Sequence, residues 1–427
     1  MAENTVHREA SPVGPQQSND RRARLRVCML VYSFYESDTR VLQYATALAK
    51  RGDKVDVIAL RRNSESPEFE VLDGVNVYRI QARSVNEKGL LSYGRRIALF
   101  FLRAMLFSRK QQRKHPYDLV HVHNVPDFLV FAVLFLKRQG VPVVLDIHDL
   151  LPEFYASKFK ISHKSFLFRI LALVERWSAS FADHVIIANH IWRERFVSRS
   201  ASAAKCSVVR NYPDLDMFVG LSSEERRNGG KLQLTYPGSL NWHQGLDVGI
   251  RAFARISDQI PEAEFHIYGE GPAKPSLIEL AKQLNLQDRV LFHNFLPTRD
   301  IARVMANTDI AIEPKRATSD FGNEALSTKI LEFMAVGVPV IASKTKIHAY
   351  YYDDSVIQYY ENDDESRLAS AILRLRNDAG LRERLVANAK QYVHENNWDY
   401  CKQEYLQMVD LLSKARSAAT LSRVMMA

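Results

Sequence analysis

The stretch RVCMLVYSFYESDTRVLQYATALAKRGDKVDVIAL, residues 26–60, decides the fold class of this chain. It opens and closes with β-branched runs, and between them apolar residues recur at helical spacing at Val41, Ala45 and Leu48. A strand, a helix and a second strand in this order form a parallel pair joined by a crossover. The stretch therefore predicts an α/β protein with a parallel sheet.

The same alternation continues along the chain and restarts after a polar stretch that ends in Gly229 and Gly230. Strand candidates before this stretch are VNVYRI, DLVHVH, VPVVLDI, DHVIIAN and CSVVRN; those after it are KLQLTYPG, AEFHIYG, RVLFHNF, TDIAIEP, VPVIAS and SVIQYY. We expect doubly wound domains at residues 23–213 and 231–395, joined by a linker at 214–230, and a length of 427 residues suits two cores. The amphipathic segment 396–427 predicts a closing helix, and the N-terminal domain is one place where it can pack.

Composition narrows the function classes. A formal charge of +9 and a pI near 9.3 favour phosphate-bearing partners, whether nucleotides, lipid head groups or nucleic acid. No run approaches the roughly 20 apolar residues of a membrane span. Cys28, Cys206 and Cys401 form no Cys-x-x-Cys pair, which argues against a zinc site or a disulfide framework and suits a cytoplasmic protein. Residues 1–22 are polar and predict a disordered tail.

The strongest functional signal is NEALSTKILEFMAVGVPVIAS, residues 323–343. Glu324 and Glu332 stand on either side of a helix start expected at Ser327 or Thr328. Backbone N–H groups at a helix start form an anion site suited to a diphosphate, and Lys329 adds a positive charge in the first turn. The alternative interpretation is a surface loop acid at Glu324 and a solvated helix residue at Glu332.

Other blocks surround this segment in a fixed order: YPGSLNWHQGLDVGIRAFA, AEFHIYGEGP, LNLQDRVLFHNFLP and NTDIAIEP. Together they resemble the family-4 retaining glycosyltransferases, with their Glu-x7-Glu signature and GT-B fold of two facing Rossmann-like domains. The resemblance continues upstream through DLVHVHNVPDFLV and VVLDIHDLLPE and covers about residues 25 to 412. Some of its details are similar to bacterial surface-polysaccharide glycosyltransferases.

The resemblance implies roles in the C-terminal half. Glu332 is expected to bond the donor ribose, Glu324 to face the transferring sugar, and Lys329 to stabilise the leaving diphosphate. The implied donor-binding set also includes Gly238, Ser239, Gln244, Gly269, Phe295, Leu296, Ser327 and Thr328.

The chain departs from the family pattern at two cations. Ser239 and Gln244 stand where the family usually has arginine and lysine, and Leu326 and Ser327 replace its common Phe-Gly. Neutralisation of the diphosphate then falls to Lys329, to the helix dipole, or to Lys315 and Arg316, and the sequence leaves this choice open.

In the N-terminal half, His148 follows a predicted strand, at the edge where open α/β sheets bind ligands. It resembles the family histidine that contacts the donor sugar. Asp146, Asp149 and Glu153 are candidates to orient it or to bind acceptor hydroxyls. The alternative interpretation is a structural histidine with capped loop acids.

His121 and His123 alternate along a strand and are expected to point to opposite faces, so that only one enters a site. His123, nearer the strand end, is the acceptor-side candidate. Asp38 is expected either to cap the next helix, with Arg40 in its first turn, or to lie with Arg40 beside the acceptor.

Two helical segments, residues 93–114 and the stretch HKSFLFRILALVERW from His163, combine apolar residues with arginine and lysine. Each predicts either a core-packed helix with solvated flanks or contact with an anionic membrane surface.

The expected function is metal-independent, hexosyltransferase-type transfer with retention, without a cofactor. The co-substrate is a UDP- or GDP-linked sugar and the acceptor a glycan or lipid-linked molecule, in surface polysaccharide synthesis at the inner face of the membrane. The alternatives are a sugar-nucleotide epimerase on the same fold and a noncatalytic basic membrane-binding relative. Nucleic acid is not expected as a partner, because basic and aromatic residues are not interleaved.

Overall fold

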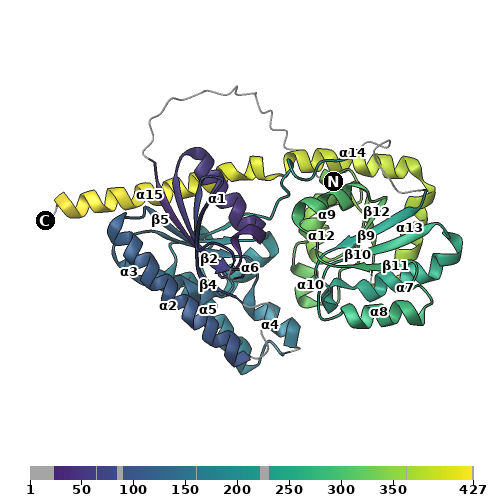
Figure 1. Ribbon diagram of the computed structural model, residues 1–427, viewed down its shortest axis with the longest axis horizontal. Coiled ribbons are helices and arrows are strands. Elements are labelled where there is room, and N and C mark those ends of the chain that lie inside the picture. The colour runs from purple at the N-terminus through teal and green to yellow at the C-terminus, as the bar shows by residue number, and fades with distance from the viewer. Residues whose placement is uncertain are drawn as a thin grey trace, which may run out of the picture.

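The computed structural model describes residues 24–63, 65–83, 90–159, 161–221, 230–361 and 363–425, with side chains throughout except at 90, 91, 158 and 417–425. Two α/β units follow each other along the chain, each built on one sheet (Figure 1). The predicted tail, residues 1–22, lies outside the described residues, and so do residues 222–229 of the predicted linker. The predicted α/β fold class of two Rossmann-like units is confirmed.

The first sheet has eight strands in the order β3-β4-β2-β1-β5-β6-β7-β8. Their bounds are β1 Arg26–Leu30, β2 Lys54–Arg61, β3 Phe69–Leu72, β4 Val75–Ala82, β5 Leu119–His123, β6 Val143–Ile147, β7 His184–Ile187 and β8 Cys206–Val208. Neighbours pair in parallel except β3 and β4. Along β1, Cys28 and Leu30 enter one core and Val27 and Met29 another, so both faces of the sheet are covered. Burial on both faces explains the continuous apolar runs.

Strand β3 was not predicted. Its residues alternate between exposed and half-buried, so the run FEVL carries little apolar signal. Asp73 and Gly74, both at positive φ, turn the chain back into β4. An Asp-Gly pair between two strand-like runs is a hairpin signal that the sequence does contain.

The second sheet has six parallel strands in the order β11-β10-β9-β12-β13-β14. Their bounds are β9 Leu232–Pro237, β10 Ala263–Tyr268, β11 Val290–His293, β12 Ile310–Glu313, β13 Val340–Ser343 and β14 Gln358–Tyr360. The order reverses between β9 and β12, as it does between β1 and β5 in the first sheet. Open parallel sheets bind ligands at such a switch point, beyond the carboxyl ends of the strands.

Helices cover the sheets in both units. The first unit holds η1 Tyr35–Ser37, α1 Thr39–Arg51, α2 Leu90–Lys114, η2 Asp127–Val133, α3 Leu134–Arg138, α4 Leu151–Phe159, α5 Phe166–Phe181, α6 His190–Arg199 and η3 Ala203–Lys205. The second holds η4 Trp242–Gln244, α7 Leu246–Ile256, η5 Ser257–Gln259, α8 Lys274–Gln283, α9 Thr298–Ala306, α10 Asp320–Glu324, α11 Thr328–Ala335, α12 Lys346–Tyr351, α13 Glu365–Asn377 and α14 Ala379–Glu395. Helix α11 begins after Ser327, as predicted.

The last helix, α15 (Trp398–Met425), leaves the second unit and returns along the first (Figure 1). It packs on α1, where the ring of Tyr405 lies 4.3 Å from that of Tyr44, centroid to centroid. Arg51 of α1 binds Asp410 at 3.0 Å. The C-terminal segment therefore joins the core of the first domain.

Candidate active site

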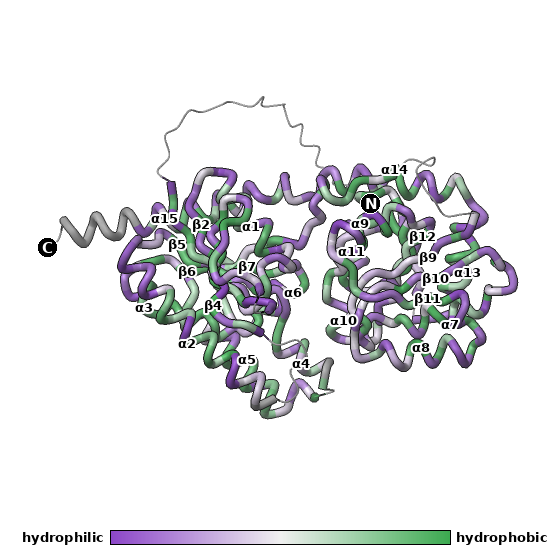
Figure 2. Tube along the Cα trace, viewed as in Figure 1, coloured by the Kyte–Doolittle hydropathy of each residue, from purple (hydrophilic) through white to green (hydrophobic). Residues whose placement is uncertain are grey.

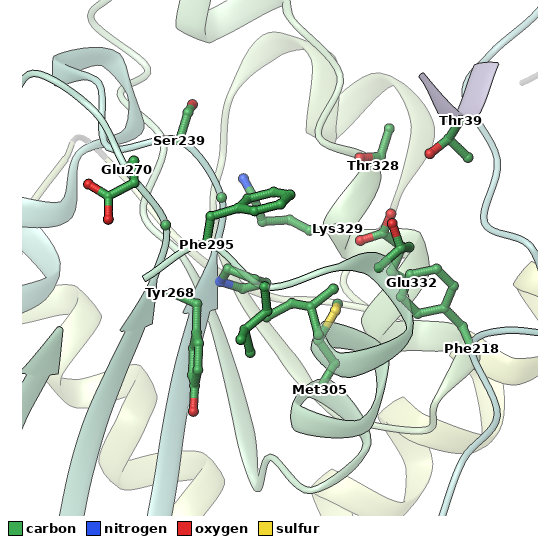
Figure 3. A pocket seen from close by; sticks show the side chains of 16 residues that line it. Thr39, Phe218, Ser239, Tyr268, Glu270, Phe295, Met305, Thr328, Lys329 and Glu332 are labelled. Carbon is green, nitrogen blue, oxygen red and sulfur yellow. The ribbon is translucent and has the colours of Figure 1, made fainter. Parts of the chain in front are cut away.

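A cavity of about 470 Å³ opens at the carboxyl end of the second sheet, at its switch point (Figure 3). Its wall includes Gly238 after β9, Gly269 after β10, Phe295 and Leu296 after β11, and Thr328, Lys329 and Glu332 of α11. Thr39, at the start of α1 in the first domain, lines it too, so both domains contribute. A volume of this size suits a ligand the size of a nucleotide.

The amino end of α11 faces this cavity through Thr328 and Lys329. Ser327 is the N-cap residue, yet its side chain makes no capping bond and accepts instead from Lys329 Nζ at 3.1 Å. The hydroxyl therefore leaves the first-turn N–H groups of the helix to a ligand. Such groups, at the positive end of the helix dipole, form a site for an anion.

Lys329 is fixed by a buried carboxylate. Its Nζ donates to Glu313 Oε2 at 2.9 Å and lies 4.7 Å from the centre of the Tyr236 ring. Burial opposes ionisation of Glu313, but the charges of Lys329 and Lys315 outweigh it and lower the pKa of that carboxyl. The lysine is thus held in place at the cavity wall.

Three cations were candidates to replace the family's arginine and lysine: Lys315, Arg316 and Lys329. Lys315 is buried, donates to the carbonyl of Ala325 at 2.7 Å, and has a pKa lowered by burial to about 8. Arg316 pairs with Asp247. Of the three cations considered, Lys329 is the one that lines the cavity.

Ser239 and Gln244 occupy the positions of the missing cations. Ser239 lines the cavity, while the buried Gln244 has its amide nitrogen 3.5 Å from Ser239 Oγ. His243, next to Gln244, has a pKa lowered to about 4 by burial and by Lys315 and Lys329. It is neutral at pH 7 and brings no compensating charge.

Gly238 and Gly269 allow the backbone to cross the cavity floor closely. A Cβ on Gly269 would lie 1.9 Å from the carbonyl oxygen of Gly238, and its φ is +140°. Gly238 has φ +146°, and a Cβ there would lie 3.0 Å from Lys329 Cε. Both positions require glycine for conformation and for space.

Glu332 lies in the cavity wall, one turn beyond Lys329 (Figure 3). Burial raises the pKa of this carboxyl to about 7, and Lys329 offsets only part of that rise. Phe295, by contrast, is 67% exposed at the cavity edge. Both residues line the same cavity.

Glu324 points elsewhere. Its carboxylate accepts from Arg195 of α6 at 2.6 Å and from Lys346 at 3.3 Å, and it is not among the residues that line the cavity. Its backbone carbonyl accepts from Asn189 at 3.1 Å. Glu324 therefore lies at the contact between the two domains, and its predicted role towards a sugar stays a prediction.

In the first domain a buried network surrounds Asp146 on β6. Arg40 donates to both of its oxygens, at 2.6 and 2.8 Å, and His123 Nδ1 and His148 Nε2 each lie 3.0 Å from Oδ2. Burial opposes ionisation, but Arg40 and His148 hold the pKa of Asp146 well below its usual range. Burial by itself would lower the pKa of His148, but Asp146 outweighs it and raises this pKa.

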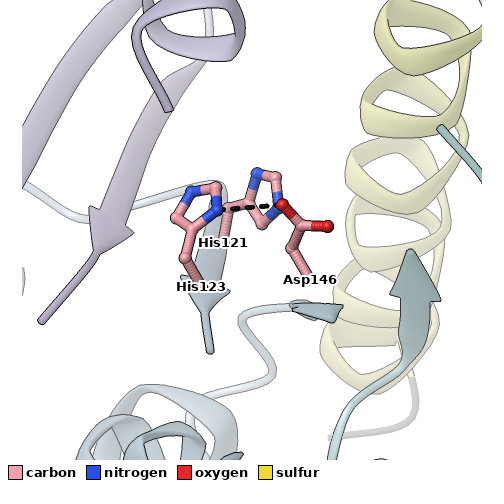
Figure 4. Close-up of side chains that lie close together, drawn as sticks. All are labelled: His121, His123 and Asp146. Atoms are coloured by element: carbon pink, nitrogen blue, oxygen red, sulfur yellow. Dashed lines mark hydrogen bonds and ion pairs between the residues drawn. The ribbon is translucent and has the colours of Figure 1, made fainter. Parts of the chain in front are cut away.

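The expectation that His121 and His123 point to opposite faces is wrong. Residues two apart in a strand lie on the same face, and their rings are 4.1 Å apart in one buried cluster with Asp146 (Figure 4). Side chains alternate between the two faces from one residue to the next, so residues two apart in the sequence share a face. His121 Nδ1 lies 3.1 Å from Tyr405 Oη of α15, and neither histidine is exposed.

This cluster also has the ligand types of a metal site. The guanidinium of Arg40, however, already occupies both oxygens of Asp146. A metal ion would be placed beside a fixed positive charge, which opposes its binding. We therefore interpret the cluster as an ion-pair network that orients His148.

The remaining first-domain candidates lie as follows. Asp38 caps α1, accepting from Val41 N at 3.3 Å, and Arg40 is buried, so the capping alternative describes this pair. Glu153 is buried against Arg199, at 2.5 and 2.9 Å, which makes it a structural residue instead of an exposed acceptor ligand. Burial raises the pKa of Asp149, and the charges of His148 and Lys315 act against that rise.

Several cavity residues were not predicted: Thr39, Phe218, Tyr268, Glu270, Thr298, Ile301 and Met305. Thr39 stands between the two predicted residues Asp38 and Arg40, and Glu270 lies within the quoted block AEFHIYGEGP. Both Thr39 and Glu270 could therefore have been proposed from their neighbours in the sequence. Arg195 carries no local signal, because its partner Glu324 is distant in sequence.

Two family models match the chain and together account for most of it. The Glycosyl transferase 4-like domain matches residues 37–212, and Glycosyl transferases group 1 matches residues 221–392. The two matches meet at the segment between the two sheets.

Curated relatives match over most of the chain. An uncharacterized glycosyltransferase of Methanocaldococcus jannaschii is 26% identical, over 84% of this chain and 90% of its own length. The alpha-D-kanosaminyltransferase of Streptomyces kanamyceticus is 25% identical over 67% and 75%. The putative colanic acid biosynthesis glycosyltransferase WcaL of Salmonella typhimurium is 26% identical over 38% and 39%.

Solved structures share the fold. The sucrose-phosphate synthase of Thermosynechococcus elongatus superposes with a TM-score of 0.73, at 20% identity, over 92% of this chain and all of the other. HepE of Anabaena, in complex with UDP and glucose, superposes with a TM-score of 0.68 at 18% identity, over 91% of this chain and all of the other. These likenesses show the GT-B arrangement.

Proposed function

Because this chain belongs to the group 1 glycosyl transferases, we propose that it moves a sugar from a nucleoside-diphosphate sugar to a glycan or lipid-linked acceptor, with retention of anomeric configuration. The observation that carries the proposal is the cavity at the amino end of α11, where Lys329 lines the wall and Thr39 reaches in from the other domain. Family membership favours transfer over epimerisation. UDP in the complex of the structurally similar HepE supports a nucleotide as the ligand of the cavity.

The donor diphosphate is proposed to lie on the first turn of α11. Thr328 and Lys329 N–H groups donate to it, and Lys329 Nζ supplies the positive charge. Gly238 and Gly269 permit close approach of backbone to the phosphates. Ser239, next to Gly238 in the cavity wall, offers a hydroxyl where the family usually has a cation.

The nucleoside is proposed to extend along the cavity wall. Glu332 accepts from the ribose hydroxyls, and Phe295 and Leu296 border the base. The sugar is proposed to lie beyond the diphosphate from the ribose and to face the first domain.

Catalysis is proposed to rest on charge stabilisation. The bond between the anomeric carbon and the phosphate oxygen breaks while the acceptor oxygen attacks from the same face, and the acceptor proton passes to the leaving phosphate. Lys329 and the α11 dipole stabilise the charge that develops there. His148, oriented by Asp146, contacts the sugar from the first domain, and cleft closure excludes water.

Three buried carboxylates, Glu313, Asp146 and Glu324, are each held in an ion pair, which does not suit a covalent nucleophile. Glu313 is bound to Lys329, Asp146 to Arg40 and Glu324 to Arg195. This supports same-face attack without a glycosyl-enzyme intermediate. A role in surface polysaccharide synthesis is supported by the WcaL relative, and the cytoplasmic location stays a prediction.

The test is an assay of transfer and slow hydrolysis with a panel of UDP- and GDP-sugars in the presence of a chelator. We expect nucleoside diphosphate release without added metal and a product with the donor's anomeric configuration, assigned by NMR. Strict dependence on metal, or an inverted product, would refute the corresponding part. The matched pair Lys329→Gln and Lys344→Gln separates a cavity lysine from a surface one; only the first is expected to lose activity.

A further inference from the structure

The first domain carries an apolar surface that its own fold does not cover. More than half of the exposed large apolar side chains of the described chain lie on α2, η2, α3, α4 and α5. On α5, Phe166 (79% exposed), Ile170, Leu173 and Trp177 (57% exposed) recur at spacings of four, three and four residues. Side chains at such spacings form one stripe along a helix.

A second stripe runs along α2. Leu99, Leu102 and Leu106 are exposed and also share one helix face. Helices α2 and α5 both pack on η2, which contributes the exposed Phe128, 6.3 Å from Phe101 of α2 by ring centroids. Figures 1 and 2 show the two long helices on the same side of the domain, with hydrophobic segments recurring along each. We call the exposed side of α2, η2 and α5 the apolar-basic face.

The exposed charged side chains of these elements are all positive. Exposed arginines and lysines on α2, α3 and α5 are Arg95, Arg103, Arg109, Lys110, Arg113, Lys114, Arg138, Arg169 and Arg176. The acids within the described residues of α2, η2, α3, α4 and α5 are Asp127, Glu153 and Glu175, and all three are buried.

Those buried acids are also bound internally. Arg199 donates to both Glu153 and Glu175, and Asn124 donates to Asp127 at 2.8 Å. The apolar-basic face therefore offers apolar side chains and positive charge to its surroundings, with no exposed acid on these elements to oppose an anionic partner. A second copy of this face would bring the same positive charge and no exposed acid on these elements, which opposes self-association through it.

We propose that the apolar-basic face docks on an anionic lipid surface, with the stripe of α5 in the interface and the arginines and lysines at the level of the head groups. Such in-plane binding combines apolar burial with attraction to anionic lipid. No described helix is long and apolar enough to cross a membrane.

The face continues towards the contact between the domains. Helix α4 packs on α5, and its exposed Phe159 stacks on Tyr155. At the other side of α4, Phe154 meets Phe321 of α10 at 5.3 Å, and Ser157 Oγ lies 3.4 Å from Ser319 Oγ. Given the proposed function, this path brings a lipid-linked acceptor from the docked surface to the cleft.

The experiment is flotation of the full chain with vesicles of phosphatidylcholine alone and of phosphatidylcholine mixed with phosphatidylglycerol, at low and high salt. We expect binding to the anionic vesicles that weakens with salt. The double variant Phe166→Glu/Trp177→Glu should lower the bound fraction about tenfold or more, because both side chains are exposed and their charge would enter the interface. Leu411→Glu, an equally exposed apolar position on α15, is the matched control and should bind as the native chain does.

The proposal would be overturned by equal flotation of the double variant and the native chain, or by a native chain whose dimer is dissociated in the double variant. Absence of binding to either vesicle would also overturn it. Thermal shift by UDP and GDP on the same variants keeps this outcome separate from the proposed function, because no residue of α5 lines the cavity. Retained nucleotide shifts without flotation would remove the docking and leave the transferase proposal standing.

Discussion

Arg195 of the first domain donates to Glu324 of the second at 2.6 Å, and this ion pair joins the two halves beside the cleft. Glu324 is 6% exposed, and Lys346 holds the same oxygen at 3.3 Å. The acid of the signature is thus fixed from both domains. We propose that this contact sets the position from which Glu324 acts on the sugar.

Replacing Glu324 by alanine tests that proposal. We expect transfer to fall on the order of 100-fold or more, while UDP or GDP binding stays unchanged, because Glu324 does not line the cavity. Glu361→Ala, a half-exposed acid of the same domain, is the control. Steady-state kinetics and calorimetry measure the two effects, and undiminished transfer would remove Glu324 from the reaction.

The glycine pair at the cavity floor gives a steric prediction. Gly269→Ala places a Cβ 1.9 Å from the Gly238 carbonyl oxygen, at φ +140°. We expect a loss of roughly 1–3 kcal/mol in unfolding free energy and weaker nucleotide binding from the displaced loop. Gly94→Ala on α2, where a Cβ has no neighbour within 4 Å, should leave nucleotide binding unchanged and raise the unfolding free energy by roughly 0.5–1 kcal/mol, because alanine favours a helix more than glycine does. Denaturant titration and calorimetry with UDP and GDP distinguish the two variants.

Glu332 predicts a pH dependence of nucleotide binding. Its pKa is about 7 in the free protein, and ribose hydroxyls donate best to the ionised carboxylate. Affinity should therefore fall as pH drops below about 7, by up to about tenfold per pH unit. The variant Glu332→Gln should flatten this dependence. Calorimetry at several pH values checks it, and an unchanged slope in the variant would assign the titration to another group.

The same carboxylate predicts a gain in stability. Above pH 7 Glu332 is ionised in the folded and unfolded states, and burial penalises its charge only in the folded state. Glu332→Gln removes that penalty and is expected to raise the unfolding free energy at pH 8 by an amount on the order of 1–3 kcal/mol. Below pH 4.5 the carboxyl is protonated in both states, and the difference should vanish. Thermal or denaturant unfolding of the native chain and of Glu332→Gln at both pH values measures this difference in unfolding free energy.

Histidine titration tests the network around Asp146. The pKa of His148 is raised, whereas burial lowers the pKa of His123 and that of His121. NMR of histidine-labelled protein should therefore show one resonance, absent from His148→Gln, that titrates above the usual histidine range. Loss of this high titration in Asp146→Asn, with the fold checked by circular dichroism, would identify Asp146 as the positioning residue. A His148 that titrates below the usual range would contradict the network.

Much of the fold could be predicted because local patterns decide it. Strands such as β5 and β6 are continuous apolar runs, since the first sheet is covered on both faces. Helix α11 could be placed from Ser327 and the spacing that follows. Strand β3 was missed because half of its side chains face solvent, although Asp73 and Gly74 signalled its turn.

The site was harder to predict where it depends on distant contacts. Lys329 could be proposed from its place in the first turn of a helix. The ion pair between Glu324 and Arg195 could not, because the two residues are far apart in the sequence. Arg40 and Glu153 were proposed for an acceptor, yet each is buried in an ion pair that only the fold brings together. The orientation of His121 and His123 was available from strand period alone and was misjudged.

The central claim is that a nucleoside diphosphate lies with its phosphates on the amino end of α11. A crystal structure of the protein soaked or grown with UDP or GDP tests it most directly. We predict phosphate oxygens at about 3 Å from the backbone nitrogens of Thr328 and Lys329, with the ribose at Glu332. A nucleotide bound elsewhere, or one whose phosphates point away from α11, would contradict the account.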